Sequence, residues 1–322
     1  MGLEKKESSL AYAVQKVRGE ELNRVKEVNM ITALAGKAAG VQVSKNSSGM
    51  GGSAKVSIRG VRSVAGDNQP LYVIDGVPML NSTSEQAYSA IGGTANAGNR
   101  DGGDGISNLN PEDVESISIL KGAPAAALYG SQAANGVILI TTKKGNTVGR
   151  RDIHFSTGLT FEKAFSLPEM QNSYGVSDVT DSWGEKENLT VYDNLGDFFR
   201  TGLTSITSVY VNSGNDKLQT YFSYANTTGR GILNENKLSK HNINLRETAV
   251  LFNSRLKLDG NVNVMKQTVK NKPVSGGFYM NPLVGLYRFP RGEGLSYYKE
   301  NYERYDEDRK LNTQNWLSLI HI

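Results

Sequence analysis

The stretch that decides the fold runs from residue 33 to residue 142 and is made of short, distinctive segments. They read ALAGKAAGVQV (33–43), VSIRG (56–60), QPLYVIDGVP (69–78), LNPEDVESI (109–117), LKG (120–122), ALYG (127–130) and NGVILITT (135–142). Most of them join a brief apolar run to a glycine or a proline, the residues that most strongly mark turns. The stretch therefore predicts a small domain of short elements separated by tight turns.

Cap and turn residues predict individual elements in this stretch. Asn29 is expected to cap a helix that Gly40 ends. The pair Asp75-Gly76 lies between two apolar runs and predicts a tight hairpin, because Asp-Gly tolerates the positive φ of such turns. Asn110, followed by a proline and two acids, indicates a second helix start. Further predicted elements are strands at 41–43, 56–58, 117–119 and 137–140 and an alanine-rich helix ending at residue 128. The result is an α+β domain with a mixed sheet.

Beyond Arg151 the pattern changes to longer segments in which apolar and polar residues alternate, which predicts strands with one apolar face. The apolar residues of five such segments are Ile153, Phe155, Leu159 and Phe161; Val209 and Val211; Leu218, Phe222 and Tyr224; Ile243 and Leu245; and Leu256, Leu258, Val262 and Val264. Each strand is expected to have about 9–11 residues, the length that crosses a bilayer when tilted. In the last strand the apolar side chains should face lipid, and Lys257, Asp259 and Asn261 should face the lumen.

The connections between these strands alternate in length. A long polar connection (163–205) is followed by a short one (214–216), a longer one (227–240), a short one near 252–253 and a long segment after residue 265. Outer-membrane barrels show this alternation, with short periplasmic turns and long external loops. The first strand should therefore start on the periplasmic side.

Composition excludes several classes of function. No run of about 18 apolar residues is present, so a bundle of membrane helices is excluded. The chain has no cysteine, and its net charge of +4 is spread without a basic cluster, which argues against nucleic-acid binding. Only three histidines occur. His154 and His241 are predicted on the polar phase of strands, facing the lumen or an interface, so a catalytic role is not expected.

In order and spacing, the segments of residues 33–142 resemble the plug domain of SusC-type (SusC/RagA-like) TonB-dependent outer-membrane transporters. The resemblance rests on motif residues Arg59, Gly60, Asp75, Gly76, Lys121, Gly122, Tyr129 and Gly130. It implies an α+β plug domain followed by antiparallel transmembrane β-barrel strands, here an incomplete part of a barrel of roughly 22 strands. Arg59 and Lys121 are either solvated charges or members of ion pairs at a plug–barrel contact. Buried charges at such a contact must be paired, and the resemblance favours the ion pairs.

The resemblance also implies a function and partners. The expected function is TonB-dependent import of a bulky nutrient, an oligosaccharide or an oligopeptide, across the bacterial outer membrane, with no enzymatic step and no cofactor or metal. The expected partners are a SusD-type surface lipoprotein and the TonB complex. The alternatives are a siderophore or vitamin receptor and a non-transporting adhesin or structural barrel, although an adhesin gains nothing from an occluding plug. Substrate-contacting residues are not identified. Six loop tyrosines have two open interpretations, stacking on sugar rings or packing against a lid protein: Tyr279, Tyr287, Tyr297, Tyr298, Tyr302 and Tyr305.

Other candidate sites are weaker. Asp101 and Asp104 loosely resemble a calcium loop, but the acid spacing and closing glutamate are missing, so a flexible polar loop is favoured and an incidental bound ion is the open alternative. The sequence around Gly36-Lys37 lacks the residues of a phosphate-binding loop. We place the plug at residues 1–148, with the boundary between Lys143 and Arg151, and the barrel strands at 149–316. Residues 317–322 match one frame of a sequencing adapter and are set aside. A signal peptide and a TonB-box segment are not recognised at the start, so the chain is expected to be an internal fragment.

Overall fold

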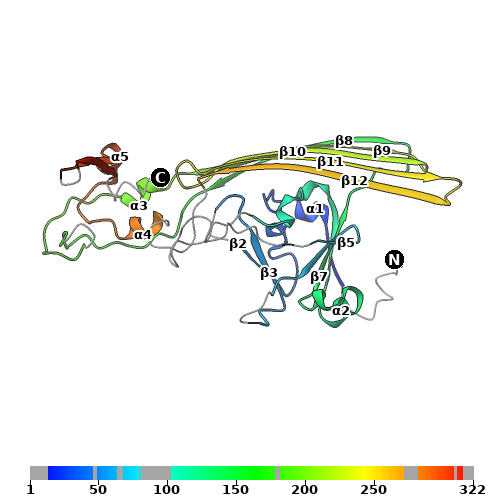
Figure 1. Cartoon of the computed structure of the whole chain (residues 1–322), viewed down its shortest axis with the longest axis horizontal. Coiled ribbons are helices and arrows are strands. Elements are labelled where there is room, and N and C mark those ends of the chain that lie inside the picture. The colour runs from blue at the N-terminus through cyan, green and yellow to red at the C-terminus, as the bar shows by residue number, and fades with distance from the viewer. Residues whose placement is uncertain are drawn as a thin grey trace.

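The computed structural model describes residues 14–45, 49–63, 68–79, 81, 103–177, 182–271, 282–307 and 310–314. We call the described residues from 14 to 142 the N-terminal unit. Five long strands form a curved sheet that arches over this unit, and we call them the wall sheet (Figure 1). Beyond one end of the wall sheet lie three short helices, α3 (Asn194–Phe198), α4 (Pro282–Tyr287) and α5 (Leu295–Glu300).

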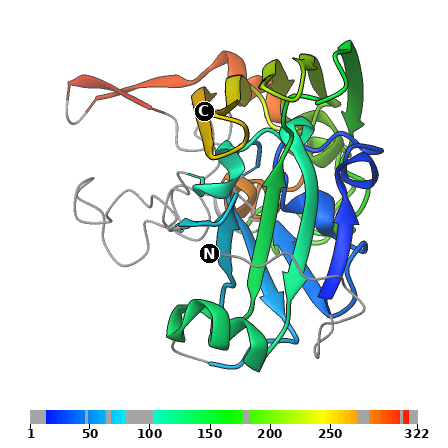
Figure 2. The same cartoon turned by 90° about the vertical axis from the view of Figure 1, so that its right-hand side faces the viewer.

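The N-terminal unit is built on a mixed sheet of order β1-β6-β7-β4-β5. Its strands are β1 (Val14–Arg18), β4 (Leu71–Ile74), β5 (Val77–Met79), β6 (Val114–Leu120) and β7 (Val137–Thr142). Only the β4–β7 pair of this sheet is parallel. A separate hairpin joins β2 (Val41–Lys45) to β3 (Ala54–Ile58), and the unit also carries helices α1 (Gly19–Leu22) and α2 (Ala123–Tyr129) (Figure 2). The predicted α+β class and mixed sheet are confirmed, whereas β1 and α1 were not foreseen.

Turn chemistry explains the β4–β5 hairpin. Asp75 (φ 48°) and Gly76 (φ 87°) both adopt positive φ, as the Asp-Gly pair predicts. Beneath this hairpin lies an apolar core that includes fully buried Leu34, Tyr72 and Ile117. Because Tyr72 of β4 is part of this core, the core fixes the base of the hairpin, and the Asp75-Gly76 turn projects away from the core.

The two predicted helix starts are wrong in type. After Asn29 only one 3-10 turn forms, Thr32–Leu34, because Ala35 already leaves the helical region with a ψ of 125° and Gly36 follows with a φ of 74°. After Asn110 the chain makes a single 3-10 turn, Pro111–Asp113, and enters β6 directly. Asn110 is the N-cap of its turn as expected, and its Oδ1 accepts a hydrogen bond from the N–H of Glu112. Asn29 is not an N-cap: that position is held by Ile31, whose N–H donates to Asn29 Oδ1 just before the turn begins.

The wall sheet is an antiparallel meander in chain order. Its strands are β8 (Arg151–Glu162), β9 (Gly202–Gly214), β10 (Leu218–Arg230), β11 (Lys237–Leu251) and β12 (Leu256–Lys270). They have 12 to 15 residues, so the expected length of 9–11 is wrong. The pairing of β10 with β11 continues beyond the alternating segments and leaves a connection of only residues 231–236, where 227–240 was expected. The alternation of longer and shorter connections is kept.

The two faces of the wall sheet differ in polarity, in the sense that the sequence predicts. Apolar side chains such as Ile153, Phe161 and Leu258 are exposed on the outer face. Buried side chains on the inner face are mainly polar: Thr204, Ser208, Ser223, Thr227, Lys240, Asn242, Asn244, Arg246 and Thr248. His241 corrects one prediction. It lies on the apolar outer phase, where its Nδ1 is 2.9 Å from the Tyr224 hydroxyl.

Helices α3, α4 and α5 share an apolar cluster that is separate from the core of the N-terminal unit. Leu195 and Phe198 of α3 pack with Leu286, Phe289 and Leu295 from the segment after β12. The two long connections are thereby joined into one structure. A further hairpin, β13 (Glu303–Asp306) with β14 (Leu311–Gln314), follows. Among the described residues, none of the helices has the length and apolarity needed to span a membrane.

Some predictions stay open. Strand β7 ends at Thr142 and β8 begins at Arg151, but the division into 1–148 and 149–316 stays a prediction. Residues 317–322, Tyr279 and Asp101 lie outside the described residues.

Candidate functional site at the contact between the N-terminal unit and the wall sheet

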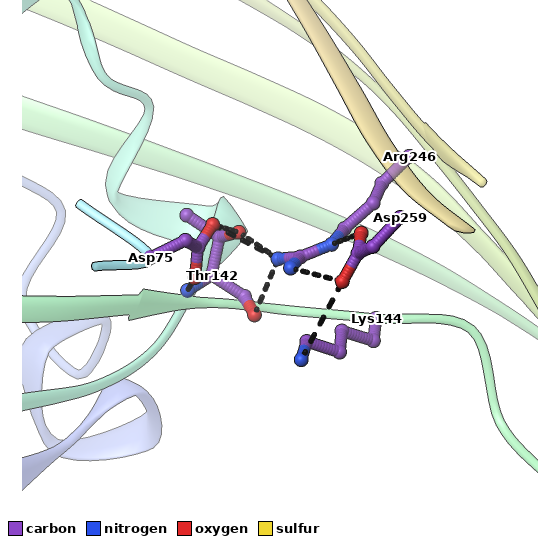
Figure 3. Close-up of polar contacts among 5 residues, drawn as sticks. All are labelled: Asp75, Thr142, Lys144, Arg246 and Asp259. Carbon is purple, nitrogen blue, oxygen red and sulfur yellow. Dashed lines mark hydrogen bonds and ion pairs between the residues drawn. The ribbon is translucent and has the colours of Figure 1, made fainter. Parts of the chain in front are cut away.

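Arg246 on β11 is the centre of the contact (Figure 3). Its Nε and Nη2 donate to the two carboxylate oxygens of Asp259 on β12, each at 2.9 Å. Its Nη1 donates to Oδ2 of Asp75 at 2.9 Å and to Oγ1 of Thr142 at 2.6 Å, both in the N-terminal unit. Lys144 Nζ lies 3.7 Å from Asp259 Oδ2. Two cations thus meet two carboxylates, which is the pairing that buried charge requires.

Local structure positions each member of this Arg246 cluster. Asp75 is held because Thr142 donates to it twice, from its backbone N–H (3.0 Å) and its hydroxyl (2.5 Å). Arg246 lies on the inner face of β11 opposite Asn261, so Asp259, two residues earlier on β12, is its diagonal neighbour on the same face. The Arg246 side chain is only 5% exposed. The cluster therefore joins the β4–β5 turn to two wall strands.

A second buried contact lies between Asp113 and β10. The Tyr221 hydroxyl donates to Asp113 Oδ1 at 2.9 Å, and both residues are fully buried. Burial raises the pKa of Asp113, an effect that Tyr221, Ser223 and the Lys143 ammonium oppose. Burial likewise lowers the pKa of Lys143, whose Nζ lies 4.1 Å from the centroid of the Tyr210 ring.

Two lysines complete the polar contact from opposite sides. Lys240 on β11 donates from Nζ to the carbonyl of Ser107 at 2.5 Å. Lys26 of the N-terminal unit forms an ion pair with Glu112 and donates to the hydroxyl of Ser156 on β8 at 2.8 Å. The Lys26 stem lies where a Cβ on Gly158 would stand, so the wall glycine makes room for it.

The motif residues other than Asp75 and Gly76 shape turns away from the Arg246 cluster. Arg59, Gly60, Gly122 and Gly130 have φ of 61°, 85°, 83° and 72°. Gly122 and Gly130 flank helix α2, which ends at Tyr129. The three glycines occupy conformations that cost a glycine little.

The expected ion pairs of Arg59 and Lys121 with the barrel do not appear among the described residues. Lys121 instead donates from Nζ to Gln15 Oε1 at 3.0 Å and to the Ala39 carbonyl at 2.5 Å. Neutral oxygens of the N-terminal unit thus satisfy its ammonium group. The ion pair that joins the two parts is made by Asp75, a motif residue, and Arg246, which the sequence analysis did not single out.

Asp104 has a structural role. Its Oδ1 accepts from the N–H of Ser107 and its Oδ2 from the N–H of Ala54. Both carboxylate oxygens are therefore engaged by backbone donors. Throughout the described ranges, no group of three histidine or acidic side chains is arranged to hold a metal ion.

A cavity of about 320 Å³ lies between the β2–β3 loop and the wall, near the end that carries the long connections. On one side are Asn29 and residues 49–53 of the N-terminal unit, and on the other are Thr204, residues 231–233 and Gln267. The loop is anchored beside it, because the Met50 side chain occupies the space above Gly229 on β10. The cavity thus lies at the junction of the two parts.

The chain is similar to known proteins in both its N-terminal unit and its wall sheet. Residues 6–137 match the TonB-dependent Receptor Plug Domain family. The chain is 30% identical to the TonB-dependent receptor SusC of Bacteroides thetaiotaomicron over 286 residues, which is 84% of this chain and 26% of that protein. It is 32% identical to the ferric enterobactin receptor PirA of Pseudomonas aeruginosa over 146 residues, 45% of this chain and 18% of that protein.

Solved structures agree in fold. The RagAB peptide importer in its closed-closed state matches with a TM-score of 0.64 and 23% identity, over 82% of this chain and 32% of that chain. The chain thus spans between a quarter and a third of the length of SusC and of the RagAB chain.

Proposed function

We propose that this chain is part of a TonB-dependent receptor of the SusC type and gates the import of a bulky nutrient, an oligosaccharide or an oligopeptide, across the outer membrane. In this proposal the N-terminal unit is the plug and the wall sheet is part of the barrel. The observation that carries it is that the plug is seated on the inner face of the wall by buried polar contacts. Each such hydrogen bond contributes a net of only about 0.5–1.5 kcal/mol, because water replaces it when it breaks. A contact between plug and wall that is held by such hydrogen bonds can separate when water enters the lumen, and it can form again.

The proposal includes the partners of the intact receptor. The TonB complex would supply the work that displaces the plug, and a SusD-type surface lipoprotein would cover the external loops. We propose that the plug spans residues 1–148 and the barrel strands 149–316, and that the motif glycines set the turns of the plug. The role is transport, with no catalytic step. Siderophore or vitamin import is the less favoured alternative, since the likeness to the enterobactin receptor covers half as much of the chain.

A reversible cross-link tests the gating role. Asn242 donates from Nδ2 to the Asn108 carbonyl at 2.7 Å, so cysteines at these two positions of the full-length receptor would lie within reach of a short bis-thiosulfonate reagent. Uptake of labelled oligopeptide and oligosaccharide pools would be measured in cells before treatment, after it and after reduction. Uptake should stop on cross-linking and recover on reduction, whereas the treated single variant Asn242→Cys should import normally.

Energised import is tested separately. Removing TonB should abolish uptake of whichever pool is taken up. Undiminished uptake through a fully cross-linked receptor would contradict the gating role, and uptake that persists without TonB would contradict the energised mechanism.

A further inference from the structure

We propose that the outer face of the wall sheet binds the phosphate groups of a lipid in the outer leaflet of the membrane. The site lies at the end of the sheet that carries the long connections, beyond which α3, α4 and α5 lie (Figure 1). It consists of Arg230, Lys237, Lys266 and Lys270, which we call the basic cluster. The proposal rests on the wall sheet being part of an outer-membrane barrel, and it concerns a ligand other than the imported nutrient.

Strand register brings the basic cluster together on one face. Arg230 pairs with Lys237, and Lys237 pairs with Lys270, so these side chains stand side by side on β10, β11 and β12. Lys266 lies four residues before Lys270 and therefore on the same face. The exposed apolar residue Val264 shares this phase, which identifies the face as the apolar outer one. All four basic residues are exposed, so a ligand outside the wall can reach them.

The basic cluster has more charge than its neighbours neutralise. Like charges directly opposite each other on neighbouring strands repel. Glu235, in the connection between β10 and β11, pairs with Lys237 at 2.6 Å. Arg230, Lys266 and Lys270 form no ion pair among the described residues. An anion bound across the cluster would relieve the repulsion, and phosphate is an anion that arginine and lysine bind well.

The slant of the apolar band on the outer face indicates how the wall lies in the membrane. On β8 the exposed apolar side chains continue to Phe161, whereas on β12 they end at Val264. The register places Phe161 level with Lys270, six residues beyond Val264. Across four strand spacings the edge of the band therefore shifts by about 20 Å along the strands, against about 19 Å across them. This corresponds to a tilt of about 45°, the tilt of strands that cross a bilayer.

At this tilt the basic cluster lies at the depth of the lipid headgroups. The outer edge of the apolar band runs from Phe161 to Val264, and Lys266 and Arg230 lie two to three residues beyond it. That offset is about 5–7 Å along the membrane normal, and the headgroup layer is about 5–8 Å thick on each side. Tyr224 lies near the same edge, where aromatic residues collect in membrane proteins.

The position favours a lipid over a soluble anion or a protein. The cluster continues the face that carries the apolar band, so a lipid can place its acyl chains on the band and its phosphates on the cluster at once. Binding of the chains raises the effective concentration of the phosphates there. Long basic side chains suit this boundary, because their stems lie on apolar surface while their charged ends reach the headgroups. A protein that covers the external loops would instead approach beyond the strand ends.

Two double variants isolate the contribution of the cluster. Arg230→Gln with Lys266→Gln removes two exposed charges that have no ion pair among the described residues and that lie at similar depth. Arg151→Gln with Arg255→Gln is the matched control, because it removes two exposed charges from the opposite end of the wall. The net charge of the receptor falls equally in both variants.

The experiment titrates the purified full-length receptor, in a neutral detergent, with three probes. They are lipid A with two phosphate groups, the same lipid A after enzymatic removal of its phosphates, and inorganic phosphate. Native mass spectrometry measures the fraction of receptor that carries each probe and hence its Kd. We expect wild type to prefer phosphorylated lipid A. The cluster variant should bind it about 30-fold more weakly, because each lost cation near a lipid surface contributes a factor of about five, and the control should stay within about twofold of wild type.

Four results would overturn the proposal. They are equal binding of phosphorylated lipid A by wild type and the cluster variant, equal binding of the lipid with and without its phosphates, binding of inorganic phosphate with the same dependence on Arg230 and Lys266, and retention of no probe by wild type. The third result would identify a site for soluble anions. The uptake assays test import by themselves, so lipid binding without uptake would contradict the import proposal alone, and uptake without lipid binding would contradict this proposal alone.

Discussion

Replacing Arg246 by methionine should loosen the plug where the β4–β5 turn meets the wall. The substitution leaves two carboxylates without their main partner, Asp75 in the plug and Asp259 on β12. Removing one partner of a fully buried pair costs about 3–5 kcal/mol. Here the two acids are 19% and 28% exposed, so water regains part of their solvation and surface pairs contribute far less. We therefore expect a loss of about 2 kcal/mol in the local stability of the seat, between these limits.

Hydrogen exchange of the full-length receptor measures this loss directly. Amides of residues 71–79 and 137–142 should exchange about 30-fold faster, the factor that corresponds to about 2 kcal/mol. The double variant Asp75→Asn with Arg246→Met should recover part of the protection, because it leaves one fewer unpaired charge. Arg255→Met, at an exposed turn position, is the control and should change nothing. Protection within twofold of wild type in Arg246→Met would refute the reasoning.

Three further predictions concern other parts of the contact and the wall. Leu258→Lys should lower the stability of the assembled receptor by about 2–4 kcal/mol if that side chain faces the lipid midplane. Asn263→Lys, on the inner face of the same strand, should assemble normally, and equal assembly yields of the two variants would contradict the face assignment. Burial raises the pKa of Asp113, so the folded plug binds the proton of this carboxyl group more tightly than the unfolded chain does. The protonated carboxyl group therefore stabilises the fold fully below the ordinary pKa of 3.8, and this stabilisation is lost as the pH rises through the raised pKa. Asp113→Asn should flatten that part of the stability–pH curve, and an unchanged slope in thermal melts would exclude this assignment. Gly229→Val should displace the Met50 side chain, because a Cβ there overlaps its terminal methyl group. Amides of residues 49–53 should then exchange faster than in wild type, and an unchanged exchange rate would count against the packing argument.

Much of the fold was readable from local sequence. The Asp75–Gly76 hairpin was predicted correctly because a two-residue turn depends on the φ preferences of those two residues. The faces of the wall strands were also predicted, because successive side chains of a strand point to opposite sides of the sheet. His241 was assigned to the wrong face although it shares the phase of Ile243 and Leu245, so the same alternation already places it on the apolar side. The helix after Asn29 was overestimated because capping signals mark where a helix can start and say little about its length.

The sequence by itself determined the plug-like order of short elements, the apolar outer face of the wall and the polar character of its inner face. Only the tertiary structure decided which polar groups meet across the contact. Asp75 and Arg246 are 171 residues apart in the chain, and their meeting depends on strand register and on how the plug sits against the wall. Local preferences act over a few residues, whereas this pairing needs the whole of both sheets in place.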